Sequence, residues 1–257
     1  MLSSKMIEKK RTILQQTKRF AYIAQKAQAS EFSQKMNKLF DENGYSNTMI
    51  PMNSEKENLS FKVNSIRKSD IDAAIISSEY VSDIVTILDS ASGMVQRSGM
   101  CDIIFKEGEK LRGDIFSVRV LTEHLKDLYA SKIAMIGVNH YAKAFSFLAC
   151  GFHLTLFNDE LDTLIRFTKE VELQKAEIHE IQQDIKLDFS EFDVVLDFSN
   201  MKSFAMVEKL AKINIDMKNK NQLSALKNRA LELHAKYVSY DDLLEKLTQK
   251  AYREIRK

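Results

Sequence analysis

Glycine and proline are scarce in this chain, which holds 7 glycines and 1 proline among 257 residues. That glycine content is less than half the usual share of about 7%. Folds that hold phosphates against the backbone place glycine where a side chain would block the approach. The composition therefore counts against a nucleotide-binding protein of the usual glycine-rich kind.

Cysteine is equally sparse, and long apolar runs are absent. Cys101 and Cys150 lie in apolar sequence and form no CxxC pair, so we expect two buried thiols in a reducing cytoplasm. No run approaches the roughly 18 apolar residues of a membrane-spanning helix, and no apolar segment follows the basic start. We therefore expect no membrane association, no secretory signal and a cytoplasmic protein.

The sequence also lacks the common signatures of metal and nucleophile chemistry. No two of its five histidines are three or four residues apart, so no metal site is expected. Neither a GxSxG segment nor a phosphate-binding P-loop occurs. The sequence therefore gives no support to a metal site, a serine nucleophile or a P-loop.

Charge is nearly balanced overall, with 38 basic and 36 acidic residues, but it is unevenly placed. Residues 1–20 and 246–257 are both strongly basic, and the long middle of the chain is acidic. Basic ends are able to bind nucleic acid. Since short basic helices are commonly just solvated faces, we expect no nucleic-acid partner and keep that function as a weaker alternative.

Strand and helix patterns alternate along most of the chain. Apolar runs of strand length lie at 20–24, 48–52, 71–76, 132–138, 152–157, 193–198 and 213–217. Helical spacing is found at 32–40, 59–66, 81–88, 116–129, 141–148, 160–180, 203–212 and 243–255. Residues 101–113 predict a hairpin around Gly108. The alternation predicts an α/β fold with parallel sheets that helices cover on both sides.

Residues 132–159 have the layout of a dinucleotide-binding βαβ unit. A strand ends at Gly137, a helix and a second strand follow, and Asp159 comes 22 positions after the glycine. An acidic residue at that spacing suits a free ribose hydroxyl and therefore favours NAD over NADP.

The loop of this unit departs from the usual pattern, because Val138, Asn139 and His140 follow the single Gly137. Asn139 is able to adopt a left-handed conformation in such a turn. The candidate cofactor contacts are Gly137, Asn139, His140 and Asp159. The alternative is a βαβ unit that only holds structure, so we expect either no cofactor or NAD.

Two segments of the first half resemble the shikimate/quinate dehydrogenase family. Residues 29–36 (ASEFSQKM) are similar to its HSxSPxxH segment, whose two serines bind the substrate carboxylate and correspond to Ser30 and Ser33. Residues 98–104 are similar to its IGAVNT segment. Ser30 or Ser33 has a second interpretation as the cap of the helix that begins there.

Two more segments extend the resemblance to about residues 20–252. Residues 132–144 stand where the family has its glycine-rich loop, and residues 244–251 resemble its closing helix. Gln249 occupies the place of a glutamine that contacts substrate, although an exposed helix residue is the alternative. Ser77, at a strand end, is a further candidate for binding substrate.

The resemblance fails at the catalytic pair. In the family a lysine after a TIPHK-like strand end acts with an aspartate in an NTDG-like segment on the hydroxyl proton, while hydride passes to the nicotinamide. Those positions are Val81 and Ser117 here, and the asparagine of IGAVNT is Asp102. Valine transfers no proton. The candidate replacements are Asp102, Glu79 and Tyr80, with a plain surface aspartate as the alternative for Asp102.

We therefore predict a two-domain protein of shikimate-dehydrogenase type with a degenerate active site. Residues 1–118 form a substrate-type α/β domain, residues 119–235 form a Rossmann-like domain, and residues 236–257 form a helix that packs back on the first. We expect no shikimate oxidation, but a small-carboxylate ligand between the domains or a scaffold role. The alternative is an NAD-dependent oxidoreductase acting on another small hydroxy acid, and a homodimer is left open.

Overall fold

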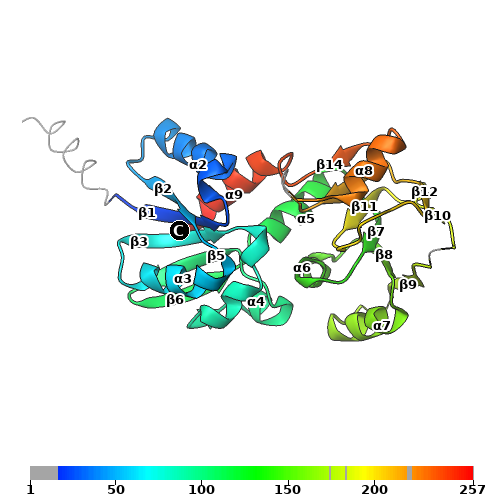
Figure 1. Ribbon diagram of the computed structural model, residues 1–257, viewed down its shortest axis with the longest axis horizontal. Coiled ribbons are helices and arrows are strands. Elements are labelled where there is room, and N and C mark those ends of the chain that lie inside the picture. The colour runs from blue at the N-terminus through cyan, green and yellow to red at the C-terminus, as the bar shows by residue number, and fades with distance from the viewer. Residues whose placement is uncertain (1–16, 174, 183, 219–221, 257) are drawn as a thin grey trace, which may run out of the picture.

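The computed structural model describes residues 17–173, 175–182, 184–218 and 222–256. It has two lobes, each built on a six-stranded sheet, with α5 (Ser117–Asp127) running between them (Figure 1). We call the sheet of residues 19–114 with its helices the first lobe, and the sheet of residues 132–238 with its helices the second lobe. Most of the basic segment 1–20 lies outside the described residues.

The sheet of the first lobe has the order β2-β1-β3-β5-β6-β4. Its strands are β1 (Arg19–Ala24), β2 (Thr48–Asn53), β3 (Ile71–Ile76), β4 (Ser90–Ala91), β5 (Ile103–Glu107) and β6 (Lys110–Asp114). Strands β1, β2 and β3 are parallel, whereas β5 runs antiparallel to both β3 and β6. The predicted hairpin is confirmed, and this sheet is mixed rather than fully parallel.

Helices cover this sheet because their apolar faces are buried against it. They are α2 (Glu31–Glu42), α3 (Leu59–Arg67), α4 (Gly93–Ser98) and the C-terminal α9 (Leu244–Ile255). Helix α9 returns from the far end of the chain to lie beside α2 and α5 (Figure 1). The ring of Tyr252 on α9 lies 5.6 Å from that of Phe40 on α2.

The sheet of the second lobe is parallel throughout, with the order β14-β13-β11-β7-β8-β9. Its strands are β7 (Lys132–Ile136), β8 (His153–Asn158), β9 (Glu177–Glu180), β11 (Val194–Asp197), β13 (Ile213–Asp216) and β14 (Tyr237–Val238). This is the strand order of the Rossmann fold. In β7, Ile133 and Met135 join one core and Ala134 and Ile136 the other, so both faces are buried.

Helices α6 (His140–Leu148), α7 (Leu161–Glu170) and α8 (Ala225–Glu232) complete the second lobe. Its first α/β crossing places the N-terminus of α6 at the carboxyl end of β7. Ligands of doubly wound sheets bind at the point where the strand order reverses, which is the crevice between β7 and β11. The fold therefore fixes where a nucleotide site would have to lie.

The prediction of one long polar helix over residues 160–180 is wrong. Helix α7 ends at Glu170, Glu172 turns the chain with a φ of 59°, and β9 then forms the edge of the sheet. Strand β9 is mostly exposed and polar, because an edge strand needs no apolar faces. Its composition therefore resembles that of a solvated helix.

The predicted helix over residues 203–212 is also wrong. Its buried residues Phe204, Val207 and Ala211 have helical spacing, but they are held by turns and by β12 (Val207–Lys209). Strand β12 pairs with β10 (Leu187–Asp188) in a small parallel sheet. Residues 81–88 contain a 3-10 helix, Asp83–Ile87, in place of the expected α-helix.

Of the two thiols, Cys101 is buried and Cys150 is exposed, so the expectation of two buried thiols is wrong for Cys150. Burial raises the pKa of the Cys101 thiol. Among the described residues, no helix combines the length and apolar character that crossing a membrane requires.

Candidate functional site

A cavity of about 230 Å³ lies at the carboxyl ends of β1 and β3. Its wall includes Tyr22, Ser30, Ser77, Glu79, Tyr240 and Asp241. The parallel strands β1 and β3 deliver Tyr22 and Ser77 to the same edge, and the segment before α9 supplies Tyr240 and Asp241. Since Glu31, Glu79 and Asp241 all line it, we call it the acidic cavity.

Glu79 is held in place by two hydrogen bonds at the wall of this cavity. Its Oε1 accepts from the backbone N–H of Gln25 at 2.9 Å, and its other oxygen accepts from the hydroxyl of Ser77. These bonds tie the exit of β1 to the exit of β3. Glu79, predicted as a candidate acid or base, therefore lines the cavity with its carboxylate fixed.

Tyr22, on β1, lies near Ser77 and Ser30 in the wall of the cavity. Burial raises the pKa of Tyr22, so this phenol is neutral at physiological pH. Ser30 is also the N-cap of α2, because its Oγ accepts from Phe32 N at 3.2 Å. The capping interpretation of Ser30 is thus confirmed, and the same residue borders the cavity.

Two other predicted substrate contacts lie elsewhere. Ser33 is buried inside α2, and its Oγ has no hydrogen-bond partner within the described residues. Gln249 contacts Glu245 on α9 and borders a separate groove beside Glu123. Of the four predicted substrate-binding residues, the fold brings Ser30 and Ser77 together at the acidic cavity.

Val81 and Ser117 occupy the two positions where the resemblance places the catalytic lysine and aspartate. Val81 is 4% exposed, and its carbonyl accepts from Cys101 N at 2.8 Å. Ser117 is buried at the start of α5. An apolar side chain and a hydroxyl thus stand where proton transfer would need a base.

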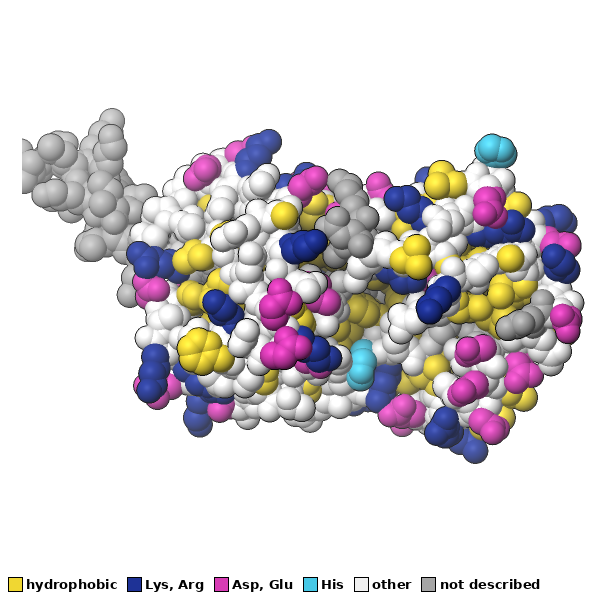
Figure 2. Space-filling model, in the orientation of Figure 1, with side chains coloured by type: hydrophobic (Ala, Val, Ile, Leu, Met, Phe, Trp, Pro, Cys, Tyr) yellow, Lys and Arg dark blue, Asp and Glu magenta, His cyan; other side chains and the backbone are white. Residues whose placement is uncertain are grey.

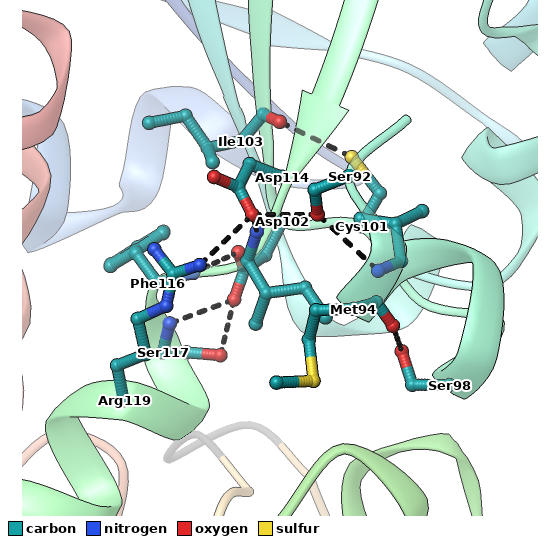
Figure 3. A network of polar contacts seen from close by, with 12 residues as sticks. Ser92, Met94, Ser98, Cys101, Asp102, Ile103, Asp114, Phe116, Ser117 and Arg119 are labelled. Atoms are coloured by element: carbon teal, nitrogen blue, oxygen red, sulfur yellow. Dashed lines mark hydrogen bonds and ion pairs between the residues drawn. The ribbon is translucent and has the colours of Figure 1, made fainter. Parts of the chain in front are cut away.

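Asp102 is tied to Ser117 at the N-terminus of α5 (Figure 3). Its carboxylate accepts from Phe116 N at 2.7 Å, from Ser117 N at 2.9 Å and from the Ser117 hydroxyl. The first N–H groups of a helix have no partner within it, and a carboxylate there also complements the helix dipole. Asp102 therefore caps α5 from another element.

The alternative of a surface aspartate is wrong, because Asp102 is 2% exposed. Burial raises its pKa to about 6, while the bonds from Ser117 and Phe116 oppose that shift. Burying an ionised carboxylate costs folding free energy unless hydrogen bonds replace those it made to water. The candidate base Asp102 is therefore occupied by a structural task and is absent from the wall of the acidic cavity.

Tyr80, another predicted candidate, is also structural. It is 4% exposed, and its hydroxyl donates to the carbonyl of Ser54. This bond joins the segment after β3 to the segment after β2. Tyr80 thus has its one donor engaged within the protein.

Tyr141, buried at the first turn of α6, is absent from the residues predicted from the sequence. Tyr141 lies close to Ser117 and to the Asp102 carboxylate, where the second lobe meets the start of α5. Burial raises its pKa well above the ordinary value, and the nearby Asp102 carboxylate adds to that shift. Apolar helical spacing assigns Tyr141 to the core, and no sequence signal separates it from a core residue.

The predicted nucleotide loop is closed against a neighbouring loop. Gly137 has a φ of 84°, and a Cβ on it would lie 2.6 Å from the backbone of Ser199. The glycine is therefore required by the contact between the loops after β7 and β11. Asn139 has φ −95° and ψ −171°, so it does not adopt the left-handed conformation that was open to it.

Asn139 instead caps α6, because its Oδ1 accepts from Ala142 N at 3.0 Å. That side chain stands where a pyrophosphate would meet the helix N-terminus. The ring Nδ1 of His140 lies 3.0 Å from the carbonyl oxygen of Ser98, so His140 turns toward the first lobe. Asp159 follows the end of β8 and is exposed, as the βαβ layout requires.

A second cavity of about 160 Å³ lies at the crevice between β7 and β11. Asn139, Tyr141, Asp197 and Lys218 line it, and Ser78 borders both cavities. Lys218 pairs with Asp197 at 3.1 Å, while burial raises the pKa of that carboxyl. This crevice cavity thus contains an internally neutralised ion pair.

The described part of the chain holds no cluster of three or more histidine, cysteine or carboxylate side chains that could bind a metal ion. On the face drawn in Figure 2, basic and acidic side chains are interspersed over both lobes.

No protein-family model matches the sequence, and no curated protein matches it. Solved structures do match. A shikimate dehydrogenase in complex with NADP+ has a TM-score of 0.74 at 17% identity, covering 93% of this chain and 90% of that one. Shikimate 5-dehydrogenase from Listeria monocytogenes, in complex with shikimate and NAD, has a TM-score of 0.70 at 15% identity, covering 93% and 91%. The fold is that of the shikimate dehydrogenases.

A 5-ketofructose reductase of Gluconobacter shares the fold as well, with a TM-score of 0.70 at 13% identity over 91% of both chains. The two-domain α/β architecture predicted from the sequence is therefore confirmed. Because proteins named for different substrates share this fold, the function of the chain has to be argued from its own residues.

Proposed function

We propose that the protein binds a small polar molecule in the acidic cavity and does not oxidise shikimate. The observation that carries this proposal is the combination of a formed cavity with an absent proton-transfer pair. Tyr22, Ser30, Ser77 and Glu79 line a space of about 230 Å³, whereas the positions of the catalytic pair are Val81 and Ser117. The chain thus has a cavity for a ligand, but it lacks the lysine and aspartate that would transfer the proton.

No other residue takes over that proton transfer in the family's arrangement. Asp102 caps α5, and Tyr80 donates to a backbone carbonyl. A general acid or base has to reach the reacting proton directly or through one water. Glu79 alone of the three candidates borders the cavity.

The residues at the crevice also fit a dinucleotide poorly. The close contact of Gly137 with Ser199 and the capping of α6 by Asn139 use the two features that would otherwise receive a pyrophosphate. Asp159 is exposed after the end of β8, where the βαβ layout would have the acidic residue that binds a ribose hydroxyl. The loop after β7 therefore does not fit the pyrophosphate of a nicotinamide cofactor.

The second candidate function is an NAD-dependent oxidoreductase acting on another small hydroxy acid. The Rossmann strand order and the exposed Asp159 favour it. Similar structures are described in complex with NADP+ or with shikimate and NAD. Saturable binding of NAD or NADH at millimolar concentration or below would support this function over the first.

The test is thermal unfolding of the purified protein with shikimate, glucose, cyclohexylamine, NAD(H) and NADP(H), each alone. A ligand at about a hundred times its dissociation constant stabilises a protein by about 2.7 kcal/mol, which is roughly 5–10 °C for a chain of this size. We expect a shift from at least one of the small polar molecules and none from the nucleotides. Ser77→Ala should reduce such a shift, and the exposed Ser65→Ala is its control. Absence of a shift with every small molecule would contradict the proposal.

A further inference from the structure

The wall of the acidic cavity combines carboxylates with aromatic rings. The residues that line it include Glu79 and three aromatic residues, Tyr22, Phe32 and Tyr240. Among the described residues of the lining, Glu31 and Asp241 are also acidic and Lys26 is basic. Acidic side chains also group on the first lobe beside its junction with the second (Figure 2). This lining has the opposite charge to a carboxylate-binding site.

Glu79 is positioned to meet a ligand rather than an internal cation. Within the described residues, no lysine, arginine or histidine forms an ion pair with it. Its two hydrogen bonds, from Gln25 N and the Ser77 hydroxyl, leave further acceptor positions on a carboxylate that offers about four. The carboxylate is half-buried, so its interaction with a charged ligand is screened less than at an open surface.

The ring of Tyr240 supplies a second source of attraction for positive charge. Tyr22 and Phe32 stack on each other with centroids 5.1 Å apart and are almost fully buried, whereas Tyr240 is half-buried. Aromatic faces attract ammonium groups by about 0.5–2 kcal/mol, more when the site is desolvated. Tyr240 lines the same cavity from the segment before α9. A carboxylate beside aromatic rings is the chemistry that recognises an amine.

We infer that the ligand of the acidic cavity is a small organic cation, a protonated amine carried on a compact ring or chain. The inference rests on the proposed function, because it names the chemical class that the proposed site takes. An ammonium group would meet Glu79, while the apolar part of the ligand would lie against Tyr240. A carboxylate ligand would meet the Glu79 carboxylate, and like charges at short range are repulsive.

The experiment is isothermal titration at pH 7 with cyclohexylamine, cyclohexanol and cyclohexanecarboxylate. The three probes share one six-membered ring and differ mainly in charge. We expect cyclohexylamine to bind at least about tenfold more tightly than either of the others. That factor corresponds to about 1.4 kcal/mol.

Two variants test whether the preference for the amine comes from Glu79. Glu79→Gln keeps the size of the side chain and an acceptor for Gln25 N, and it should abolish the preference for the amine. Glu55→Gln is the matched control, because Glu55 is an exposed neighbour that accepts from the Gln25 side chain and does not border the cavity. The control should leave the preference unchanged, whereas an equal loss in both variants would overturn the inference.

The outcomes separate this inference from the proposed function. Equal or tighter binding of cyclohexanol or cyclohexanecarboxylate would overturn the inference and leave the proposed function standing. An amine preference that survives in Glu79→Gln would also overturn it. Binding of none of the three probes at millimolar concentration, with no thermal shift from shikimate or glucose, would overturn both.

Discussion

The carboxylate of Asp102 receives both the backbone N–H and the side-chain hydroxyl of Ser117 (Figure 3). The two residues stand where the resemblance to shikimate dehydrogenases places an asparagine and a catalytic aspartate. A carboxylate is therefore still present at this point of the fold, but Asp102 carries it at the asparagine position, and the aspartate position is Ser117. Its hydrogen bonds hold α5 to the first lobe instead of facing a ligand.

This arrangement predicts a specific pH dependence of stability. Burial raises the pKa of Asp102 from 3.8 to about 6, so between these values the folded protein binds a proton that the unfolded chain has released. The free energy of unfolding should therefore fall as pH rises from 4 toward 7. The contribution is at most about 3 kcal/mol, at about 1.4 kcal/mol per pKa unit.

Asp102→Asn removes this titrating group, so its unfolding free energy should lose that component of the pH dependence. Urea unfolding of both proteins at pH 4.5, 5.5, 6.5 and 7.5 measures the difference. We expect the wild type to lose stability relative to the variant across this range. A constant difference between the two proteins would show that Asp102 does not titrate there.

Asp102→Ala should lower the free energy of unfolding more than Ser117→Ala does. Asp102→Ala leaves two buried N–H groups and one hydroxyl unsatisfied, at about 1–3 kcal/mol for a buried unsatisfied group. Ser117→Ala removes one hydroxyl bond and should cost about 1 kcal/mol. Chemical denaturation at pH 7 compares them, and an equal or larger loss in Ser117→Ala would contradict the capping role of Asp102.

The contact between the loops after β7 and β11 can be tested with glycine substitutions. Gly137→Ala would place a methyl group 2.6 Å from the backbone of Ser199, whereas Gly151→Ala meets no atom within 4 Å. Both glycines have positive φ, so both variants carry backbone strain. Overpacking should cost Gly137→Ala a further 1–3 kcal/mol or so. Equal denaturation midpoints for the two variants would mean that the loops separate readily.

Tyr80→Phe tests whether this candidate residue is structural. The change removes the hydroxyl that donates to the Ser54 carbonyl, and we expect a loss of about 1 kcal/mol. Tyr129→Phe is the control, since Tyr129 is 92% exposed. Thermal unfolding should separate the two variants, and ligand binding in the acidic cavity should survive in both.

The parts of the fold that the sequence predicts best are the buried strands. Residues 73–76 and 133–136 are apolar on both faces because both faces are covered, and a continuous apolar run is typical of such a strand. The same reasoning misses the strand at residues 177–180, because an edge strand is exposed and polar. It also predicts a false helix at residues 204, 207 and 211, because these buried turn residues have helical spacing.

The candidate site was predictable only where a residue's role depends on its own position. Ser30 follows from its place before a helix, and Ser77 and Glu79 follow from the end of a buried strand. The burial of Asp102 depends on N–H groups 14 and 15 residues away. The position of Tyr141 between the lobes depends on the packing of α6 against α5, which no local pattern encodes.

The most direct test of the proposed function is a turnover measurement. Purified protein is incubated with shikimate and either NADP+ or NAD+, and the absorbance of reduced nicotinamide is followed against a protein-free blank. We predict no formation of reduced nucleotide above the blank at any protein concentration, because Val81 and Ser117 provide no proton acceptor. A rate that increases in proportion to protein concentration would contradict this prediction.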